Sequence, residues 1–326
     1  MGELAFRAAA PDDRPAILAL LSASLGWGDD ERFRSFYEWK HERNPFGRSP
    51  GLVAVDGDRI IGFRTFLRWE FVGPSGEIRR AVRAVDTATD PQYQGRGVFR
   101  ALTLRAVDDL TAESVAFVFN TPNARSRPGY LSMGWVEVGR LRTSIRLCSP
   151  GSAFRMMRSR VPAARWSTDT SAGRAASEVL ADPGLADLLR SIGRPARLHT
   201  NRTVEYLRWR YDFAPLSYRA LTVSDRVADG LAIFRLRSRG RSLECALCEL
   251  LVPDRDPGAS QALLRAVAGT AGADYVIRIG GAVLDRAGYV RLPRQGPVLT
   301  WRPLADSTSA ASLSDWSLCL GDVELF

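Results

Sequence analysis

A short segment of the chain combines residue types that suit the binding of a phosphate group. Residues 84–89, AVDTAT, have the pattern of a β-strand, and Gln92, Gly95 and Gly97 follow just before a helical pattern. Glycines at the start of a helix let the backbone approach a ligand closely because they carry no side chain. The first turn of a helix also offers unpaired N–H groups and the positive end of the helix dipole. Together these features predict a phosphate-binding site at the start of this helix.

Two other glycine-rich phosphate loops do not fit the same residues. A P-loop requires lysine and then serine or threonine after its last glycine, and no lysine follows Gly97. A dinucleotide-binding turn requires G-x-G-x-x-G, and Arg100 stands where its third glycine should be. The pattern Q-x-x-G-x-G therefore needs a different interpretation.

Hydrophobic periodicity and turn residues predict the elements that position this loop. The chain before residue 150 is expected to form a strand, two helices, three strands, a helix, a strand, a short helix and a last strand. Their expected ranges are 4–8, 11–25, 31–41, 52–57, 59–72, 78–89, 99–110, 115–120, 123–133 and 136–148.

The rest of the chain divides into a connector and a second unit. Prolines, glycines and serines interrupt residues 151–200, which we interpret as a connector with short helices. Residues 201–326 are expected to hold strands at 218–223, 230–237, 242–252, 275–279 and 298–302, with a helix at 261–268. This order repeats the second half of residues 1–150, which favours two copies of one fold.

The loop and its downstream residues resemble a known family. GNAT (GCN5-related) N-acetyltransferases carry the pyrophosphate loop [QR]-x-x-G-x-[GA], which Gln92, Gly95 and Gly97 match. That family often places an asparagine on the following helix, a tyrosine seven residues later, and a glycine followed by an aromatic residue four residues after that. Asn123, Tyr130 and the pair Gly134-Trp135 stand at those spacings.

The resemblance is closest to bacterial tandem-GNAT acetyltransferases. It rests on WKHERNPFG (39–47), VDTATDPQYQGRG (85–97) and FNTPNARSRPGYLSMGW (119–135). It implies an α/β fold of the mixed α+β type, in which a mostly antiparallel sheet is flanked by helices, present in two copies. The second copy would be degenerate, because DRDPGASQALL (254–264) keeps only Gly258 of the loop.

These observations give an expected domain organisation. We expect residues 1–150 to form the acyl-CoA-binding catalytic domain, residues 151–200 a helical connector, and residues 201–326 a degenerate GNAT-like domain. The resemblance thus implies one active site, in the first domain.

The resemblance also implies a reaction. The protein would be an N-acyltransferase, by default an N-acetyltransferase, that moves an acyl group from acyl-CoA to a primary amine by direct attack. Acetyl-CoA or another acyl-CoA would be the co-substrate. Tyr130 would act as the general acid for the leaving thiolate, since a phenol keeps its proton at neutral pH. A backbone N–H near Thr87 would stabilise the oxyanion.

The residues implied in cofactor binding lie on the strand, the loop and the two helices that follow. Backbone groups of Asp86–Thr89 would pair with the pantetheine arm as an added strand, and N–H groups of Gln94–Val98 would hold the pyrophosphate. The full set is Asp86, Thr87, Ala88, Thr89, Gln92, Gln94, Gly95, Arg96, Gly97, Val98, Phe99, Asn123 and Tyr130.

The general base has several candidates. Asp86 is the first, because relatives often place a carboxylate on this strand. Glu70, a chain of water molecules and the C-terminal carboxylate of Phe326 are the others. Each assigned residue also has a structural interpretation: Tyr130 as a core aromatic residue, Asn123 as a helix cap, and Asp86 as a polar group of the strand.

Three other functions are compatible with the same sequence features. The protein could bind acyl-CoA as a sensor without turnover, or be a peptidyl transferase that uses aminoacyl-tRNA, since that group of enzymes is also built from paired GNAT-like units. The intact loop argues against the second rival. A structural or interaction protein, with the second unit as a docking module, is the third.

Composition argues against nucleic acid and metal as partners. The net charge is +9, but arginines spread along the chain without a run of five or six, and Lys40 is the only lysine. A diffuse positive field also suits a polyanionic co-substrate.

Cys245 and Cys248 lie three apart in a predicted strand, so their side chains should point to opposite faces and not share an ion. We expect no metal site.

The expected location is the cytoplasm. The first residues lack the charged start and apolar run of a signal peptide, and no apolar stretch reaches 18 residues. We therefore expect no membrane association, a small-molecule amine as the acceptor, and a homodimer as one option for assembly.

Overall fold

The computed structural model describes residues 4–28, 30–158, 161–281, 283–305 and 310–324. The chain divides into two compact units, each built from separated segments. The first contains residues 1–73, 77–139 and 298–315, and the second contains residues 74–76, 140–297 and 316–326. No helix within the described ranges has the length and apolar character needed to cross a membrane.

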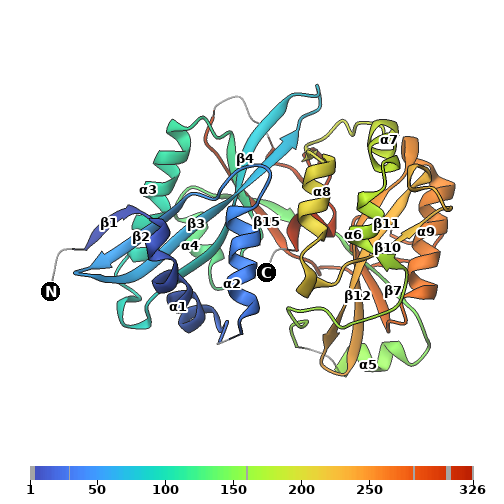
Figure 1. The fold of residues 1–326 in the computed structure, drawn as a ribbon, viewed down its shortest axis with the longest axis horizontal. Helices are drawn as coiled ribbons and strands as arrows, with labels where there is room; N and C mark the ends of the chain where they lie inside the picture. The colour runs from blue at the N-terminus through green and yellow to red at the C-terminus, as the bar shows by residue number, and fades with distance from the viewer. Residues whose placement is uncertain (1–3, 29, 159–160, 282, 306–309, 325–326) are drawn as a thin grey trace. The chain divides into compact units, whose positions relative to one another are not determined.

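The first unit is a sheet with helices on its faces (Figure 1). Its strand order is β1-β2-β3-β4-β5-β15-β6; β4 and β5 run parallel, and the pairs β1-β2, β2-β3, β3-β4 and β5-β15 are antiparallel. The strands are β1 (Ala5–Ala8), β2 (Gly51–Asp56), β3 (Arg59–Val72), β4 (Ile78–Thr89), β5 (Phe117–Asn120), β6 (Val136–Arg140) and β15 (Val298–Pro303).

The helices of the first unit cover the sheet because its strands are apolar on both faces. The helices are α1 (Arg14–Leu25), α2 (Arg32–Tyr37), which continues as a π-helical turn over Glu38–Glu42, α3 (Val98–Ala112) and α4 (Arg127–Leu131). Leu52 and Ala54 of β2 pack in one core with Leu102 of α3. Val53 between them is also fully buried, and a strand turns alternate side chains to opposite faces, so the other face is covered as well.

The second unit contains a second sheet of the same kind. Its order is β14-β7-β13-β12-β11-β10-β8, and only β12 and β13 run parallel among its described pairs. The strands are β7 (Thr143–Leu147), β8 (Arg174–Ala175), β10 (Arg219–Thr222), β11 (Leu231–Arg239), β12 (Ser242–Leu251), β13 (Tyr275–Ile279) and β14 (Val290–Arg291), with β9 (His199–Thr200) outside this order. The helices are α5 (Ser152–Arg158), α6 (Ala176–Ala181), α7 (Gly184–Ser191), α8 (Val204–Tyr211), α9 (Pro257–Thr270) and α10 (Leu320–Val323).

The two sheets share one succession of elements. In the first, β3 and β4 form an antiparallel pair, α3 follows, and β5 returns parallel to β4. In the second, β11 and β12, then α9, then β13 repeat these relations. The part of the predicted order that runs from the strand pair through the helix to the next strand is therefore present in both sheets.

The strands of the structure differ from the sequence-based prediction in three places. The strand expected at 136–148 is two strands: β6 belongs to the first sheet, and β7 pairs with β13 and β14 in the second. The strand expected at 298–302 to end the second unit is β15, which pairs with β5 in the first sheet. The predicted connector also contributes β8, which pairs with β10.

Candidate active site

The parallel strands β4 and β5 separate along their length. β5 pairs with β4 only at Ala81–Arg83 and ends at Asn120, whereas β4 continues to Thr89. β4 stays paired with β3 on its other side as far as Thr89. Within the described chain, the last residues of β4 thus have no strand partner on the β5 side. Their N–H and C=O groups can accept an extended ligand as an added strand.

A β-bulge lies in this free part of β4. Thr65 of β3 faces Val85, and Phe63 faces Ala88, so that Arg64 alone lies opposite both Asp86 and Thr87. A bulge redirects the groups of the strand that carries the extra residue. Asp86 has φ = 40°, a left-handed conformation that costs energy for a residue with a side chain. The surrounding structure must therefore hold the bulge in place.

The predicted phosphate loop connects the free end of β4 to α3. Gly95 and Gly97 have φ of 76° and 78°, which explains why glycine stands at both positions. A Cβ atom added at either glycine would meet no atom within 4 Å, so the space beside the loop is open. Gly97 is the N-cap of α3, and no side chain caps this helix. The first N–H groups of α3 are therefore available to an anion.

The other predicted loop residues divide between open and packed positions. Gln92 is exposed, Gln94 donates to the Thr89 carbonyl at 3.4 Å, and the Arg96 guanidinium lies 4.8 Å from the centre of the Tyr93 ring. Val98 is buried in the core beneath α3. These positions leave the backbone of the loop, rather than its side chains, as the main feature available to a ligand.

Tyr130 lies in α4 beside the first turn of α3. Its ring packs edge-on against Phe99 with centres 5.5 Å apart, and against Trp135 at 5.1 Å. The hydroxyl accepts a hydrogen bond from Nη1 of Arg64 at 2.9 Å. The structure thus brings Tyr130 to the residues that follow the glycine loop.

Asn123 has a local structural role in the turn before α4. Its side-chain Oδ1 accepts hydrogen bonds from the N–H groups of Arg125 and Ser126, both at 2.9 Å. Such a bond pattern stabilises the turn that leads into the helix. The assignment of Asn123 to cofactor binding stays a prediction. The structure shows its side chain stabilising the turn, whereas the N-cap of α4 is Ser126.

Asp86 belongs to a buried cluster that the sequence did not reveal. Its Oδ2 lies 2.7 Å from Nζ of Lys40 and 2.8 Å from Nε2 of His41, and Nδ1 of His41 lies 3.0 Å from the Ser49 hydroxyl. Lys40 and His41 are neighbours on the π-helical turn, and both contact Asp86 in the bulge of β4. An ionised carboxylate accepts only, so Nε2 of His41 donates to Asp86 and Nδ1 accepts from Ser49.

The charges of this cluster make Asp86 a weak base. Burial alone would raise the pKa of the Asp86 carboxyl, but Lys40 and the hydrogen bond from His41 hold this pKa well below its usual range. Burial lowers the pKa of His41, although the hydrogen bond to Asp86 opposes this shift. Asp86 is therefore held ionised as a structural anchor, which weakens the role of general base that we expected for it.

The other base candidates lie elsewhere. Glu70 is five residues along β3 from Thr65, which faces Val85, so its backbone is about 16 Å from the bulge at the usual rise per residue. The carboxylate of Phe326 lies outside the described residues.

The start of α9 in the second unit is capped, unlike the start of α3. The side chain of Asp256 caps this helix and accepts from the N–H groups of Gly258 at 2.7 Å and Ala259 at 3.2 Å. A carboxylate thus occupies the place where a phosphate would bind at α3.

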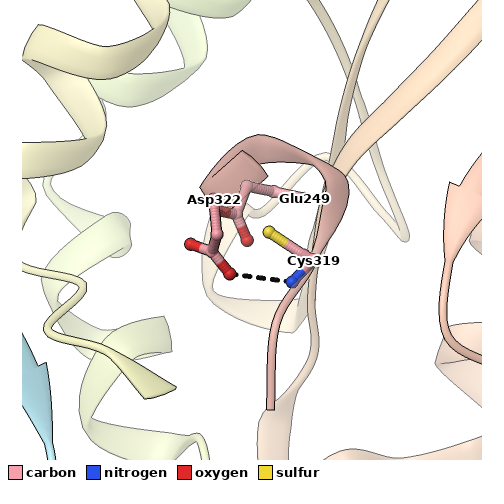
Figure 2. A group of neighbouring side chains, drawn as sticks. All are labelled: Glu249, Cys319 and Asp322. Carbon is pink, nitrogen blue, oxygen red and sulfur yellow. Dashed lines mark hydrogen bonds between the residues drawn. The ribbon is translucent and has the colours of Figure 1, made fainter. Parts of the chain in front are cut away.

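One group of potential metal ligands occurs among the described residues. Glu249, Cys319 and Asp322 of the second unit have ligand atoms within 4.8 Å of one another (Figure 2). Arg202 already supplies a positive charge to them. Its Nε lies 2.9 Å from Glu249, and its Nη2 lies 3.0 Å from Asp322 and 3.1 Å from the Cys319 sulfur. The arrangement is a buried ion-pair network centred on an arginine.

Comparisons with known proteins agree with this geometry. A family model described as an acetyltransferase (GNAT) domain matches residues 5–138. No curated protein sequence matches the chain. Residues 5–138 thus match a GNAT acetyltransferase domain, a family whose members generally use acetyl-CoA as a co-substrate.

Several solved structures have a similar fold over 93% of the chain. A probable N-acyltransferase from Enterococcus faecalis V583 is 13% identical with a TM-score of 0.67, and the match covers 93% of this chain and 72% of that one. A GCN5-related N-acetyltransferase from Anabaena variabilis is 9% identical with a TM-score of 0.62 (93% and 73% covered). One from Kribbella flavida is 16% identical with a TM-score of 0.59 (93% and 72% covered). At these identities the likeness shows the fold, and it confirms the predicted fold class.

Proposed function

We propose that the protein is an N-acyltransferase that moves an acyl group, by default acetyl, from acyl-CoA to the primary amine of a small molecule. The observation that carries the proposal is the free end of β4, which leads directly into the open glycine loop and the uncapped start of α3. An extended pantetheine arm followed by a pyrophosphate requires these two features in this order.

The residues around this path have distinct parts in the proposed reaction. Backbone groups of Asp86–Thr89 pair with the pantetheine arm, and N–H groups of Gln94–Val98 bind the pyrophosphate. A backbone N–H near Thr87, in the bulge, stabilises the oxyanion of the tetrahedral intermediate. Tyr130 then protonates the departing thiolate, for which its buried position beside Phe99 is suited.

We propose one active site for the chain, in the first unit. The shared succession of elements supports a tandem arrangement of two GNAT-like units. The Asp256 carboxylate at the start of α9 supports the loss of cofactor binding in the second unit, because it repels and displaces a phosphate. All four cysteines are free thiols, which supports a reducing compartment such as the cytoplasm.

Replacing Tyr130 with phenylalanine tests the transferase proposal. The variant should keep its affinity for acetyl-CoA within about threefold, while kcat should fall by about 100-fold or more, as expected for removal of a general acid. Calorimetric titration gives the affinity, and release of free CoA thiol in the presence of an amine gives the rate.

Tyr289→Phe is the matched control for this experiment. Tyr289 is also fully buried, and its hydroxyl donates to the Leu264 carbonyl in the second unit. The control should leave kcat unchanged. A wild-type protein that binds acetyl-CoA but transfers nothing to any amine would favour a sensor over an enzyme.

A further inference from the structure

Arg64 of β3 is a buried cation without a carboxylate partner in the described part of the chain. It is fully buried, and its Nη1 donates to the Tyr130 hydroxyl at 2.9 Å. Its Nε and Nη2 are buried and have no hydrogen-bond partner among the described residues. Arg235, equally buried in the second unit, instead pairs with Glu324 at 2.9 Å.

Aromatic rings surround the Arg64 guanidinium. Its central carbon lies 4.3 Å from the centre of the Phe66 ring, 5.4 Å from that of Tyr130 and 5.8 Å from that of Phe99. Ring faces attract a cation, but they replace only part of the hydration that burial removes. A neutral side chain of similar size would serve the core at lower cost. Stability of the fold therefore does not explain why a charged residue is buried at position 64.

The position of Arg64 suggests that explanation. Arg64 is the residue of β3 opposite the bulge formed by Asp86 and Thr87, and it contacts Phe99 at the start of α3. In the proposed function these elements surround the thioester. A fixed positive charge at this place stabilises negative charge that appears during the reaction.

We propose that Arg64 is a positioning residue that acts through Tyr130, an inference that rests on the proposed transferase function. The hydrogen bond from Nη1 orients the phenol. When the C–S bond of the intermediate breaks, its electron pair goes to sulfur, and the Tyr130 proton moves to that sulfur. Arg64 then offsets the charge of the phenolate oxygen. The amine releases its proton to solvent, and the phenolate of Tyr130 takes up a proton from solvent.

Arg64→Met separates this role from a structural one. Methionine fills a similar volume without the unpaired charge, so the melting temperature should stay the same or rise. The value of kcat should fall by about tenfold or more, and KM for acetyl-CoA should change by less than about threefold. Arg64→Lys, which keeps the charge, should recover part of the loss.

Arg235→Met is the contrasting control. It removes a buried arginine that has a carboxylate partner, so it should lower the melting temperature and leave kcat unchanged. If Arg64→Met behaves in this way, Arg64 is structural and the proposal is wrong.

A double-mutant cycle decides whether Arg64 acts through Tyr130. Because the two residues form one unit, Arg64→Met/Tyr130→Phe should be no more than about twofold slower than Tyr130→Phe alone. Losses that multiply would overturn the proposal and leave the transferase function intact. An unaltered kcat in Tyr130→Phe itself would overturn both the general acid and the role of Arg64.

Discussion

Lys40→Met is expected to lower the free energy of unfolding by about 3 kcal/mol, because it leaves the buried carboxylate of Asp86 without its cationic partner. Nζ of Lys40 lies 2.7 Å from Asp86, and the side chains are 0% and 5% exposed, so water cannot replace the lost charge. Denaturant unfolding followed by tryptophan fluorescence gives the change.

The same substitution should also slow acyl transfer. The Lys40–Asp86 pair holds a bulge in which Asp86 has a left-handed backbone, and the proposed oxyanion donor near Thr87 is part of that bulge. Relaxation of the bulge moves this donor, and loss of one such donor typically costs about 100-fold in kcat.

A second variant separates the charge from the packing. Lys40→Met/Asp86→Asn removes both charges, so it should recover more than half of the stability lost in the single variant. If the double variant is as unstable as the single one, the buried ion pair is not what holds the bulge.

Arg202→Met should lower the stability of the second unit by about 4 kcal/mol, the largest effect that we expect there. It leaves Glu249 and Asp322 buried close together without the guanidinium that pairs with both. Burial already raises the pKa of Glu249 against the opposing charge of Arg202, so the site depends on this arginine. Thermal unfolding by calorimetry measures the change.

Arg190→Met provides the control for this prediction. Arg190 pairs with Asp187 on the surface of α7, where its side chain is 78% exposed, and such pairs contribute less than about 1 kcal/mol. Equal effects of the two substitutions would show that the Arg202 network does not stabilise the second unit.

Local features of this protein could be predicted from the sequence, because neighbouring residues determine them. The left-handed turns at Gly95 and Gly97, and the helix that follows, depend on glycine and on periodicity within a short segment. The resemblance implied only that Asp86–Thr89 pair with a pantetheine arm; the separation of β4 from β5 is a finding of the structure.

Contacts between distant segments could not be predicted in the same way. The Asp86 cluster joins residues 45 positions apart, and nothing in the spacing of Lys40 and His41 identifies their partner. Arg64 is one of many arginines, and only its burial without a carboxylate distinguishes it. The sequence likewise does not show which sheet β7 and β15 join, because strands of different sheets have the same local pattern of residues.

In the proposed function, the glycine loop before α3 binds the pyrophosphate of acyl-CoA. Calorimetric titration of acetyl-CoA should be made with the wild-type protein, with Gly95→Glu/Gly97→Glu, and with Gly272→Glu/Gly280→Glu as the control. The control glycines also have positive φ and no atom within 4 Å of an added Cβ, so they match the backbone strain of the test pair. We expect binding in the micromolar range by the wild type and the control, and none by the folded loop variant. Equal binding by all three proteins, or by none of them, would contradict the proposed site.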